Sequence, residues 1–493
     1  MPAAEAPVPG GKLSVEVDDA ARARLGLSPA RRRRSRRRSP RRWGFVFLAF
    51  AAVSLLFWQG AGGADGGPFF GATLPSVSAP LPPREVPPAG LPPELLARLP
   101  VSKAVLGFAT TAPRASDSDA AAGPALDPAA PPRFVEWVEA PAGLAGPLRV
   151  EYALDAALTE RVFKRLRHAR VRRGHVVVMD IRSGRVMAYA SADPDALPPR
   201  GAYPAASLAK VVTAAASLDH NRARALEPCR YRGDPYRLTR SRVNPARGGH
   251  VATLTKALAR SYNQCFAQLA VHALGLQETR RAFERFGWED TPGVGHAQGQ
   301  IDPGEGDYGL GKLGSGLAGS RITALHAAQL VGSLATGELV APWWIDRVVD
   351  AEGHALPLPE RGARRRVMTV ATAEEMRRML VKTTTAGTAR GAFRTRRGPR
   401  LRGLQVAGKT GNLTGSDPRA RYEWFAGVAP ASDPRVAVAV VQAHGHLWWK
   451  MSAEIAAEVF TDLFCEGKRC DAAVASQFTG DLDIEPTLLG PDL

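Results

Sequence analysis

Cysteine is scarce in this chain of 493 residues, which contains four. Disulfide-stapled scaffolds are short and rich in cysteine, so this number fits an exported enzyme that does not depend on a disulfide framework. Cys465 and Cys470 are close enough in sequence to close a small loop. Cys265 is expected to be a buried apolar residue, and the sequence does not decide whether it pairs with Cys229.

Lysine is also rare, with ten lysines among 65 basic residues. Lys210 is the only lysine with a serine three places before it, which is Ser207. Proline and small residues lead into a run with helix character here, so Ser207 is expected at a helix N-terminus with Lys210 one turn further on the same face. Serine needs a neighbouring base to act as a nucleophile, and a lysine in a dry, positively charged pocket can lose its proton near neutral pH. The free backbone N–H groups of the helix start would face an oxyanion formed on Ser207.

Two further motifs follow the Ser-x-x-Lys pattern in order. Ser261-Tyr262-Asn263 is the only Ser-x-Asn among four asparagines, and Lys409-Thr410-Gly411 is the only Lys-Thr-Gly. They begin 54 and 202 residues after Ser207. Taken singly these residues have simpler roles as helix caps, surface lysines or strand formers. Three unique motifs in this order, however, indicate the active site of an acylated serine enzyme.

Signals for a cofactor or a metal are weak. The glycine-rich stretch 304–319 has no Lys-Ser/Thr after it in P-loop spacing, so its glycines are expected to permit turns and tight packing. His444 and His446 are two histidines without further ligands in the sequence around them. The sequence therefore predicts neither a cofactor nor a metal.

Positive charge is concentrated at the N-terminus of a chain whose net charge is +18. Residues 1–42 hold twelve Lys/Arg and four Asp/Glu, and residues 43–60 carry no charge over a length that gives about 27 Å of helix. This positive-inside arrangement predicts a basic cytoplasmic tail over 1–42 and a single-pass anchor over 43–60, with the rest exported. The arginines are then expected to set topology and contact anionic lipid, not nucleic acid. The alternatives for the span are a cleaved signal peptide and, from Arg41-Arg42, a twin-arginine signal.

Composition divides the exported part into three regions. Fifteen of the forty prolines fall between residues 61 and 132, so 61–148 is expected to be a linker or a short N-terminal region. Regular patterning begins at Arg149 and predicts one domain over 149–466, followed by a C-terminal tail over 467–493. Within that domain, residues 390–402 carry six arginines, which indicate a solvated loop or a contact with an anionic surface.

Hydrophobic periodicity predicts an α+β domain. The expected strands cover 149–154, 175–181, 185–190, 403–414, 423–428 and 436–442. The expected helices cover 156–170, 253–259, 264–274, 322–335, 374–381 and 451–464. Because strands precede and follow the Ser207 segment, its helix is expected to pack under a sheet.

From about Arg149 to Phe464 the chain resembles the transpeptidase domain of penicillin-binding proteins. Besides the three motifs, the resemblance includes the hairpin at 176–191, the segment 387–389 and the strand 424–430. It implies an antiparallel sheet flanked by helices and an all-helical subdomain. A short basic tail, one anchor and an exported transpeptidase domain resemble the monofunctional class B type, placed in the bacterial cytoplasmic (inner) membrane with the catalytic domain on the periplasmic side.

This resemblance implies a role for each motif residue. Ser207 would attack the carbonyl between the two terminal D-alanines of a peptidoglycan stem peptide and form an acyl-enzyme, while Lys210 takes the serine proton. Ser261 would relay a proton towards the leaving group, and Asn263 would hydrogen-bond the substrate backbone and Lys210. β-Lactams would acylate the same serine.

The third motif would bind the substrate. Lys409 and Thr410 would meet the terminal carboxylate, and Gly411 would leave room for a substrate strand along the edge of the sheet. The backbone N–H groups of Ser207 and Asn412 would form the oxyanion hole. Asn412 stands where the family commonly has threonine, which matters little because only its backbone N–H is used.

Several functions share these motifs. A peptidoglycan D,D-transpeptidase is the leading hypothesis, and a D,D-carboxypeptidase differs only in using water as the acceptor. A β-lactamase would need a carboxylate placed for deacylation, and none stands out. A β-lactam sensor or a scaffold for other cell-wall synthesis proteins is the alternative from another class. The chain has no stretch like the family's glycosyltransferase domain, and the segment before Arg149 is short for the usual pedestal, so cell-cycle role, partner proteins and oligomeric state are not predicted.

Overall fold

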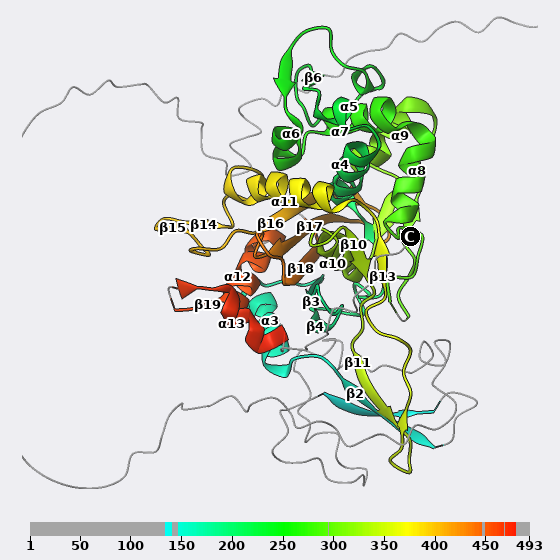
Figure 1. Ribbon diagram of the computed structural model, residues 1–493, viewed down its shortest axis with the longest axis vertical. Helices are drawn as coiled ribbons and strands as arrows, with labels where there is room; N and C mark the ends of the chain where they lie inside the picture. The colour runs from blue at the N-terminus through cyan, green and yellow to red at the C-terminus, as the bar shows by residue number, and fades with distance from the viewer. Residues whose placement is uncertain (1–133, 141–145, 294, 446–448, 468, 480–493) are drawn as a thin grey trace, which may run out of the picture. The chain divides into compact units, whose positions relative to one another are not determined.

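Five strands drawn from both ends of the domain form one antiparallel sheet in the computed structural model (Figure 1). The structure describes residues 134–140, 146–293, 295–445, 449–467 and 469–479. Within them, the sheet has the order β16-β17-β18-β3-β4. Its strands are β3 (Gly174–Asp180), β4 (Val186–Ser191), β16 (Ala407–Gly415), β17 (Ala420–Ala429) and β18 (Val436–His444). The strands expected at 175–181, 185–190, 423–428 and 436–442 are confirmed, whereas the one expected from Gly403 begins at Ala407.

The sheet is apolar on both faces because helices cover both of them. Alternate residues of β3 face two separate cores, with Val177 in one and Val176 in the other, as the two-residue repeat of a strand requires. Side chains from α3 and α12 fill the second core, and side chains from α4, α10 and α11 fill the first (Figure 1). These helices span α3 (Ala156–His168), α4 (Ala209–His220), α10 (Ala324–Gly332), α11 (Val370–Thr385) and α12 (Ser452–Phe464).

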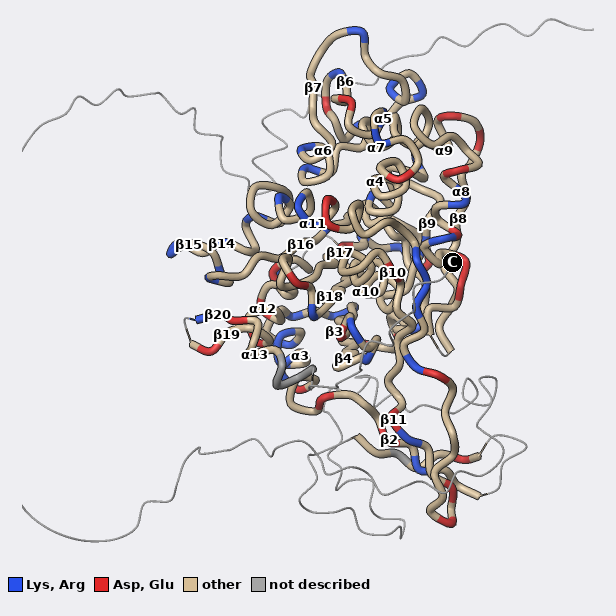
Figure 2. Tube along the Cα trace, in the orientation of Figure 1, with Lys and Arg blue, Asp and Glu red and all other residues tan. Residues whose placement is uncertain are grey.

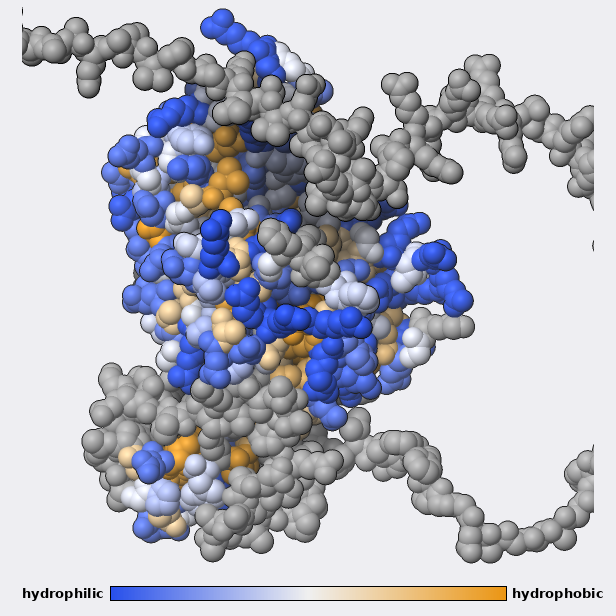
Figure 3. Space-filling model, turned by 180° about the vertical axis from the view of Figure 1, so that it is seen from behind, coloured by the Kyte–Doolittle hydropathy of each residue, from blue (hydrophilic) through white to orange (hydrophobic). Residues whose placement is uncertain are grey.

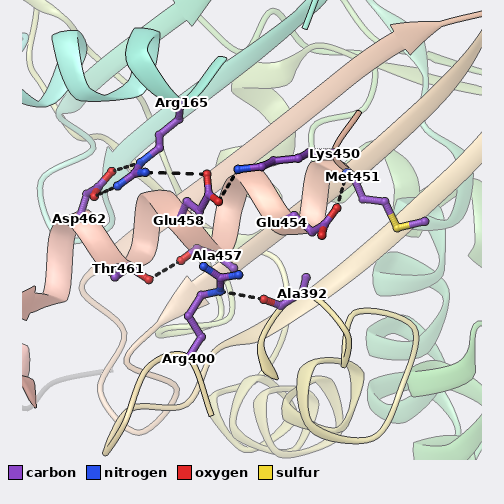
Figure 4. A network of polar contacts seen from close by, with 10 residues as sticks. All are labelled: Arg165, Ala392, Arg400, Lys450, Met451, Glu454, Ala457, Glu458, Thr461 and Asp462. Carbon is purple, nitrogen blue, oxygen red and sulfur yellow. Dashed lines mark hydrogen bonds and ion pairs between the residues drawn. The ribbon is translucent and has the colours of Figure 1, made fainter. Parts of the chain in front are cut away.

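Ion pairs join the two helices on the α12 face (Figure 4). Arg165 of α3 donates to both carboxylate oxygens of Asp462 at 2.7 and 2.5 Å. Lys450 lies 2.6 Å from Glu458, which is also 4.0 Å from Arg165. A bidentate, half-buried pair of this kind is stronger than a typical surface pair. It fixes α3, near the start of the domain, against α12, near its end.

A helical subdomain is inserted between β5 (Tyr203–Pro204) and β9 (Ser320–Ile322) (Figure 1). Its elements after α4 are α5 (Arg222–Leu226), α6 (Leu254–Arg260), α7 (Asn263–Gln268), the π-helix η4 (Leu269–Leu274), α8 (Gly275–Arg285) and α9 (Gly306–Ser315). The glycine-rich stretch was expected to permit turns and tight packing, and ten of its residues form α9. The expected tight packing is confirmed, since a Cβ on Gly314 would lie 2.3 Å from the Ala270 Cβ.

A second, smaller sheet has the order β1-β2-β11-β12. The strands are β1 (Val135–Glu139), β2 (Pro147–Tyr152), β11 (Ile345–Val349) and β12 (Ala355–Leu356). β1 lies inside the stretch 61–148 that was expected to be a linker or a short N-terminal region, so the C-terminal end of that stretch is structured. Val138 of β1 is buried beside β2. This apolar contact holds the strand in place, and the proline-rich composition of 61–148 as a whole gave no sign of it.

The remaining strands form short pairs and one three-stranded sheet. They are β6 (Cys229–Tyr231), β7 (His250–Ala252), β8 (Gln300–Ile301), β10 (Glu338–Val340), β13 (Arg364–Arg366), β14 (Arg394–Thr395), β15 (Gly398–Pro399), β19 (Cys465–Glu466) and β20 (Arg469–Cys470). A last helix, α13 (Ala472–Thr479), follows β20.

All four cysteines are disulfide-bonded, as Cys229–Cys265 and Cys465–Cys470. Cys265 is buried, as expected, but it is half of a disulfide that ties α7 to β6. The pairing of Cys465 with Cys470 closes the small loop between β19 and β20.

The predicted tail over 1–42 and the predicted anchor over 43–60 lie outside the described residues. Within the described ranges, none of the helices combines the length and the apolar character needed to cross a membrane.

Candidate active site

Ser207 lies in a 3-10 turn, η2 (Ala206–Leu208), that runs directly into α4, as the sequence predicted. The turn is held from both sides. Trp424 Nε1 of β17 donates to the Pro204 carbonyl at 2.9 Å, and Gly316 passes so close that a Cβ there would lie 1.9 Å from the Ala206 oxygen. Ala206 itself has a φ of 50°, which is uncommon for a residue with a side chain. Ser207 therefore sits on a strained turn that neighbouring elements fix in place.

Lys210 is fully buried and its Nζ has three oxygen neighbours. These are Ser207 Oγ at 2.7 Å, Asn263 Oδ1 at 2.8 Å and the Ser315 carbonyl at 2.6 Å. Burial, followed by the charge of Lys409, lowers the pKa of Lys210 well below that of an ordinary lysine. A neutral amine has two N–H donors and one lone pair. The two carbonyl oxygens can only accept, so the lone pair is left for the Ser207 hydroxyl.

The second motif lies in the break between α6 and α7, where a loop between two helices was predicted. Asn263 begins α7, and its Nδ2 donates to the Tyr236 carbonyl at 2.7 Å, which turns the amide oxygen towards Lys210. Ser261 ends α6 in the left-handed region with a φ of 61°. Its Oγ accepts from Lys409 Nζ at 2.9 Å. The two residues of one short motif thus contact the two buried lysines.

The third motif lies on β16, the edge strand of the five-stranded sheet. Lys409 is fully buried and its Nζ also donates to the Thr410 carbonyl at 2.8 Å. Burial lowers the pKa of Lys409 to about 7. Thr410 Oγ1 lies 2.6 Å from Thr388 Oγ1, and the Asn412 side chain accepts from Arg421 Nε at 2.8 Å.

Gly411 brings the third motif against η2, the turn that carries Ser207. A Cβ built on Gly411 would lie 3.2 Å from the Ala206 Cβ and 3.2 Å from the Trp424 Cβ. A side chain at this position would therefore press on η2. The absence of one allows the edge of β16 to run beside Ser207, where an extended peptide can add a further strand.

These contacts bring together the segments that carry seven of the eight residues predicted for the site. The eighth, Asn412, follows Gly411 on β16, and its side chain bonds Arg421. Three others were missed: the Ser315 and Tyr236 carbonyls, which orient Lys210 and Asn263, and the Thr388 hydroxyl. A backbone carbonyl has no sequence signature. Among the described residues, no three His, Cys, Asp or Glu side chains gather as a metal site would require.

Residues 174–464 match the family model described as the penicillin-binding protein transpeptidase domain. The chain belongs to this family. Among curated proteins, it is similar to the peptidoglycan D,D-transpeptidase PbpA of Mycolicibacterium smegmatis, with 26% identity over 208 residues, 41% of this chain and 40% of that one. PbpA of Mycobacterium tuberculosis is 25% identical over 255 residues, 49% of this chain and 50% of that one. The chain thus spans half or less of the length of these relatives.

Solved penicillin-binding proteins have a similar fold. Penicillin-binding protein 3 of Mycobacterium tuberculosis, in complex with aztreonam, aligns with a TM-score of 0.52 at 20% identity, over 63% of this chain and 77% of that one. Penicillin-binding protein A of M. tuberculosis, as an imipenem acyl-enzyme, aligns with a TM-score of 0.52 at 22% identity, over 63% of this chain and 78% of that one. At these identities the likeness shows the α+β transpeptidase fold and no more.

Proposed function

We propose that this transpeptidase-family chain is a peptidoglycan D,D-transpeptidase that forms an acyl-enzyme on Ser207 and is acylated there by penicillin. The observation that carries the proposal is the set of three neighbours around Lys210 Nζ. They leave a neutral amine with its lone pair 2.7 Å from Ser207 Oγ, which is the arrangement needed by a nucleophile and its base. The predicted basic tail and anchor support a place in the cytoplasmic membrane, with the domain outside.

Acylation needs one bond to form and one to break. Ser207 Oγ attacks the carbonyl between two D-alanines while its proton passes to Lys210 Nζ. The developing oxyanion accepts from the backbone N–H groups of Ser207 and Asn412. The C–N bond then breaks, and the proton reaches the leaving D-alanine amine through Ser261, which lies 2.9 Å from Lys409 Nζ.

The edge of β16 and the charged Lys409 side chain bind the substrate. Lys409 and Thr410 bind the terminal carboxylate, and Asn263 binds the substrate backbone. The acyl group is then transferred to an amine of a second stem peptide, which restores Ser207. In a penicillin the amine that leaves the carbonyl stays tethered by the opened ring, so the ester on Ser207 persists.

Covalent labelling tests this proposal. The full-length protein in detergent is incubated with a fluorescent penicillin beside Ser207→Ala and, as a matched control, Ser241→Ala at an exposed serine. Stable label is expected on the wild type and on Ser241→Ala, with none on Ser207→Ala. Label that survives in Ser207→Ala would refute the assignment. No label on a well-folded wild type would favour the scaffold alternative.

The fate of the acyl group separates the related reactions. Donor and acceptor stem peptides are supplied together, and the products are resolved by mass spectrometry. A cross-linked dimer is expected. Loss of D-alanine alone would identify a D,D-carboxypeptidase, and rapid hydrolysis of the penicillin would identify a β-lactamase.

The acylation rate should fall as pH rises through about 7. The pKa of Lys409 is lowered to about 7 by burial, so this lysine is charged below that pH and loses its attraction for the penicillin carboxylate above it. The second-order rate constant, which reports the free enzyme, should therefore drop about tenfold per pH unit on the alkaline side. Lys409→Arg keeps its charge at all these pH values, so its profile should be flat there. An unchanged alkaline fall in Lys409→Arg would assign the titration to another group.

A further inference from the structure

A hairpin rich in arginine projects from the domain between α11 and β16. We call residues 390–402 the arginine arm. It includes β14 and β15, and its six arginines are at positions 390, 394, 396, 397, 400 and 402. Figure 1 shows the two strands at the side of the domain, and Figure 2 shows them coloured for basic residues. In the reverse view, hydrophilic side chains project at the right, which corresponds to the left of Figure 1 (Figure 3).

The charge of the arginine arm is not neutralised within the described part of the chain. Between Glu375 and Asp417 the sequence has no Asp or Glu, and none of the six arginines forms an ion pair with another described residue. The side-chain hydrogen bonds of the arm join it to itself, and in one of them Arg400 Nε donates to the Ala392 carbonyl at 3.0 Å (Figure 4). Arg396 and Arg397, at the tip, are exposed. A guanidinium is a fork suited to carboxylates, so the arm presents preformed sites for acidic groups.

An apolar pocket lies at the base of the arm. Its volume is about 380 Å³, and Phe393, Leu401 and Val406 contribute to its lining. Arg394 of β14 is also among the residues that line it. A ligand that filled this pocket and also paired with the arginines of the arm would need apolar side chains and negative charges close together.

Such a segment occurs in the chain itself. Residues 480–493 contain four Asp/Glu and no Lys or Arg. Acidic residues at 481, 483 and 485 alternate with Leu482 and Ile484. In an extended backbone this alternation places carboxylates on one side and aliphatic groups on the other. We propose that residues 480–493 bind the arginine arm, with carboxylates on its arginines and aliphatic side chains in the pocket.

The path of the chain brings this segment within reach. A Cβ on Gly403, which lines the pocket, would lie 3.6 Å from the Cys470 carbonyl. From there α13 advances eight residues, a rise of about 12 Å. The fourteen residues that follow can extend over roughly 46 Å, which is sufficient to return to the arm.

Site-specific photo-cross-linking tests the contact. The photo-reactive amino acid p-benzoylphenylalanine replaces Leu482 in the full-length protein in detergent, and cross-linked peptides are mapped by mass spectrometry. The cross-link is expected within residues 390–406 of the same molecule. Arg396→Glu with Arg397→Glu should lower its yield about tenfold, because two attractions become repulsions. Arg280→Glu with Arg281→Glu, two adjacent exposed arginines on α8, should leave the yield unchanged.

A charge exchange decides the specificity of the contact. Adding Asp481→Arg and Asp483→Arg to the reversed arm should restore the cross-link, provided that circular dichroism shows unchanged melting. The proposal would be overturned if the arm variant and the α8 variant gave equal cross-link yields, or if the charge exchange failed to restore the cross-link. A cross-link that appears only as a covalent dimer would place the segment on a second copy and would also overturn it.

Discussion

Replacing Lys210 with methionine should lower the rate of Ser207 acylation by penicillin by about 10²- to 10⁴-fold, the usual contribution of a general base. The amine lies 2.7 Å from Ser207 Oγ. Methionine keeps an unbranched, flexible side chain that fits an apolar site, but its thioether sulfur is too weakly basic to take the proton. Stopped-flow quenching or gel fluorescence with a labelled penicillin measures the rate.

The control for Lys210→Met is Lys256→Met, at an exposed lysine on α6, which should acylate at the wild-type rate. Methionine fits the buried position, but the Ser315 carbonyl and Asn263 Oδ1 both lose their donor, so the free energy of unfolding should fall by about 1–3 kcal/mol for each of them. Acylation within threefold of the wild type would show that another group takes the serine proton.

Gly316→Ala should damage both the fold and the chemistry. Its φ is 68°, and the new Cβ would lie 1.9 Å from the Ala206 oxygen and 2.6 Å from the Ala206 carbonyl carbon. Backbone cannot rotate away as a side chain can, so η2 must move. Overpacking costs about 1–3 kcal/mol or more, and the left-handed φ adds about 1 kcal/mol. A displacement of the nucleophile by about 1 Å can cost about 10²-fold in rate.

Gly306→Ala isolates the effect of the clash. Gly306 begins the helix that Gly316 ends, has a φ of 53° and would have no neighbouring atom within 4 Å of an added Cβ. Its substitution should therefore lower stability by about 1 kcal/mol without changing acylation. Thermal melting and penicillin labelling of both variants provide the comparison. If the two variants acylate equally fast, contact between Gly316 and η2 does not position Ser207.

The sequence was sufficient to predict the side chains of the site because each has a chemical identity and a spacing. Ser207 and Lys210 are three residues apart on one helix start, so local geometry places them together. β3 and β18 are rich in valine, and β4 and β17 combine valine with aromatic and small apolar residues, so they were recognised from their composition. Strand ends such as the start of β16 depend on pairing with β17, which no local pattern contains.

Other features depend on contacts between distant segments. The carbonyl of Ser315 reaches Lys210 because α9 packs against α7 through glycines. Tight packing at these glycines was expected, but the helix that carries them was not. The Cys229–Cys265 bond could not be predicted, since sequence spacing does not fix which cysteines meet. β1 was missed because prolines dominate the region before it.

The order of the main sheet affects the chain during its synthesis. β18 pairs with β3, with Val436 opposite Asp180, and closing so long a loop is slow because its entropy is lost before the contacts form. Synthesis is N-terminal first, so the β3–β4 hairpin waits, with both faces apolar, until residue 444 has been made. A nascent chain must therefore keep this hairpin from aggregating for most of its elongation. Lys409 is also synthesised late in the chain. Covalent binding of penicillin would therefore detect completed molecules and not incomplete chains.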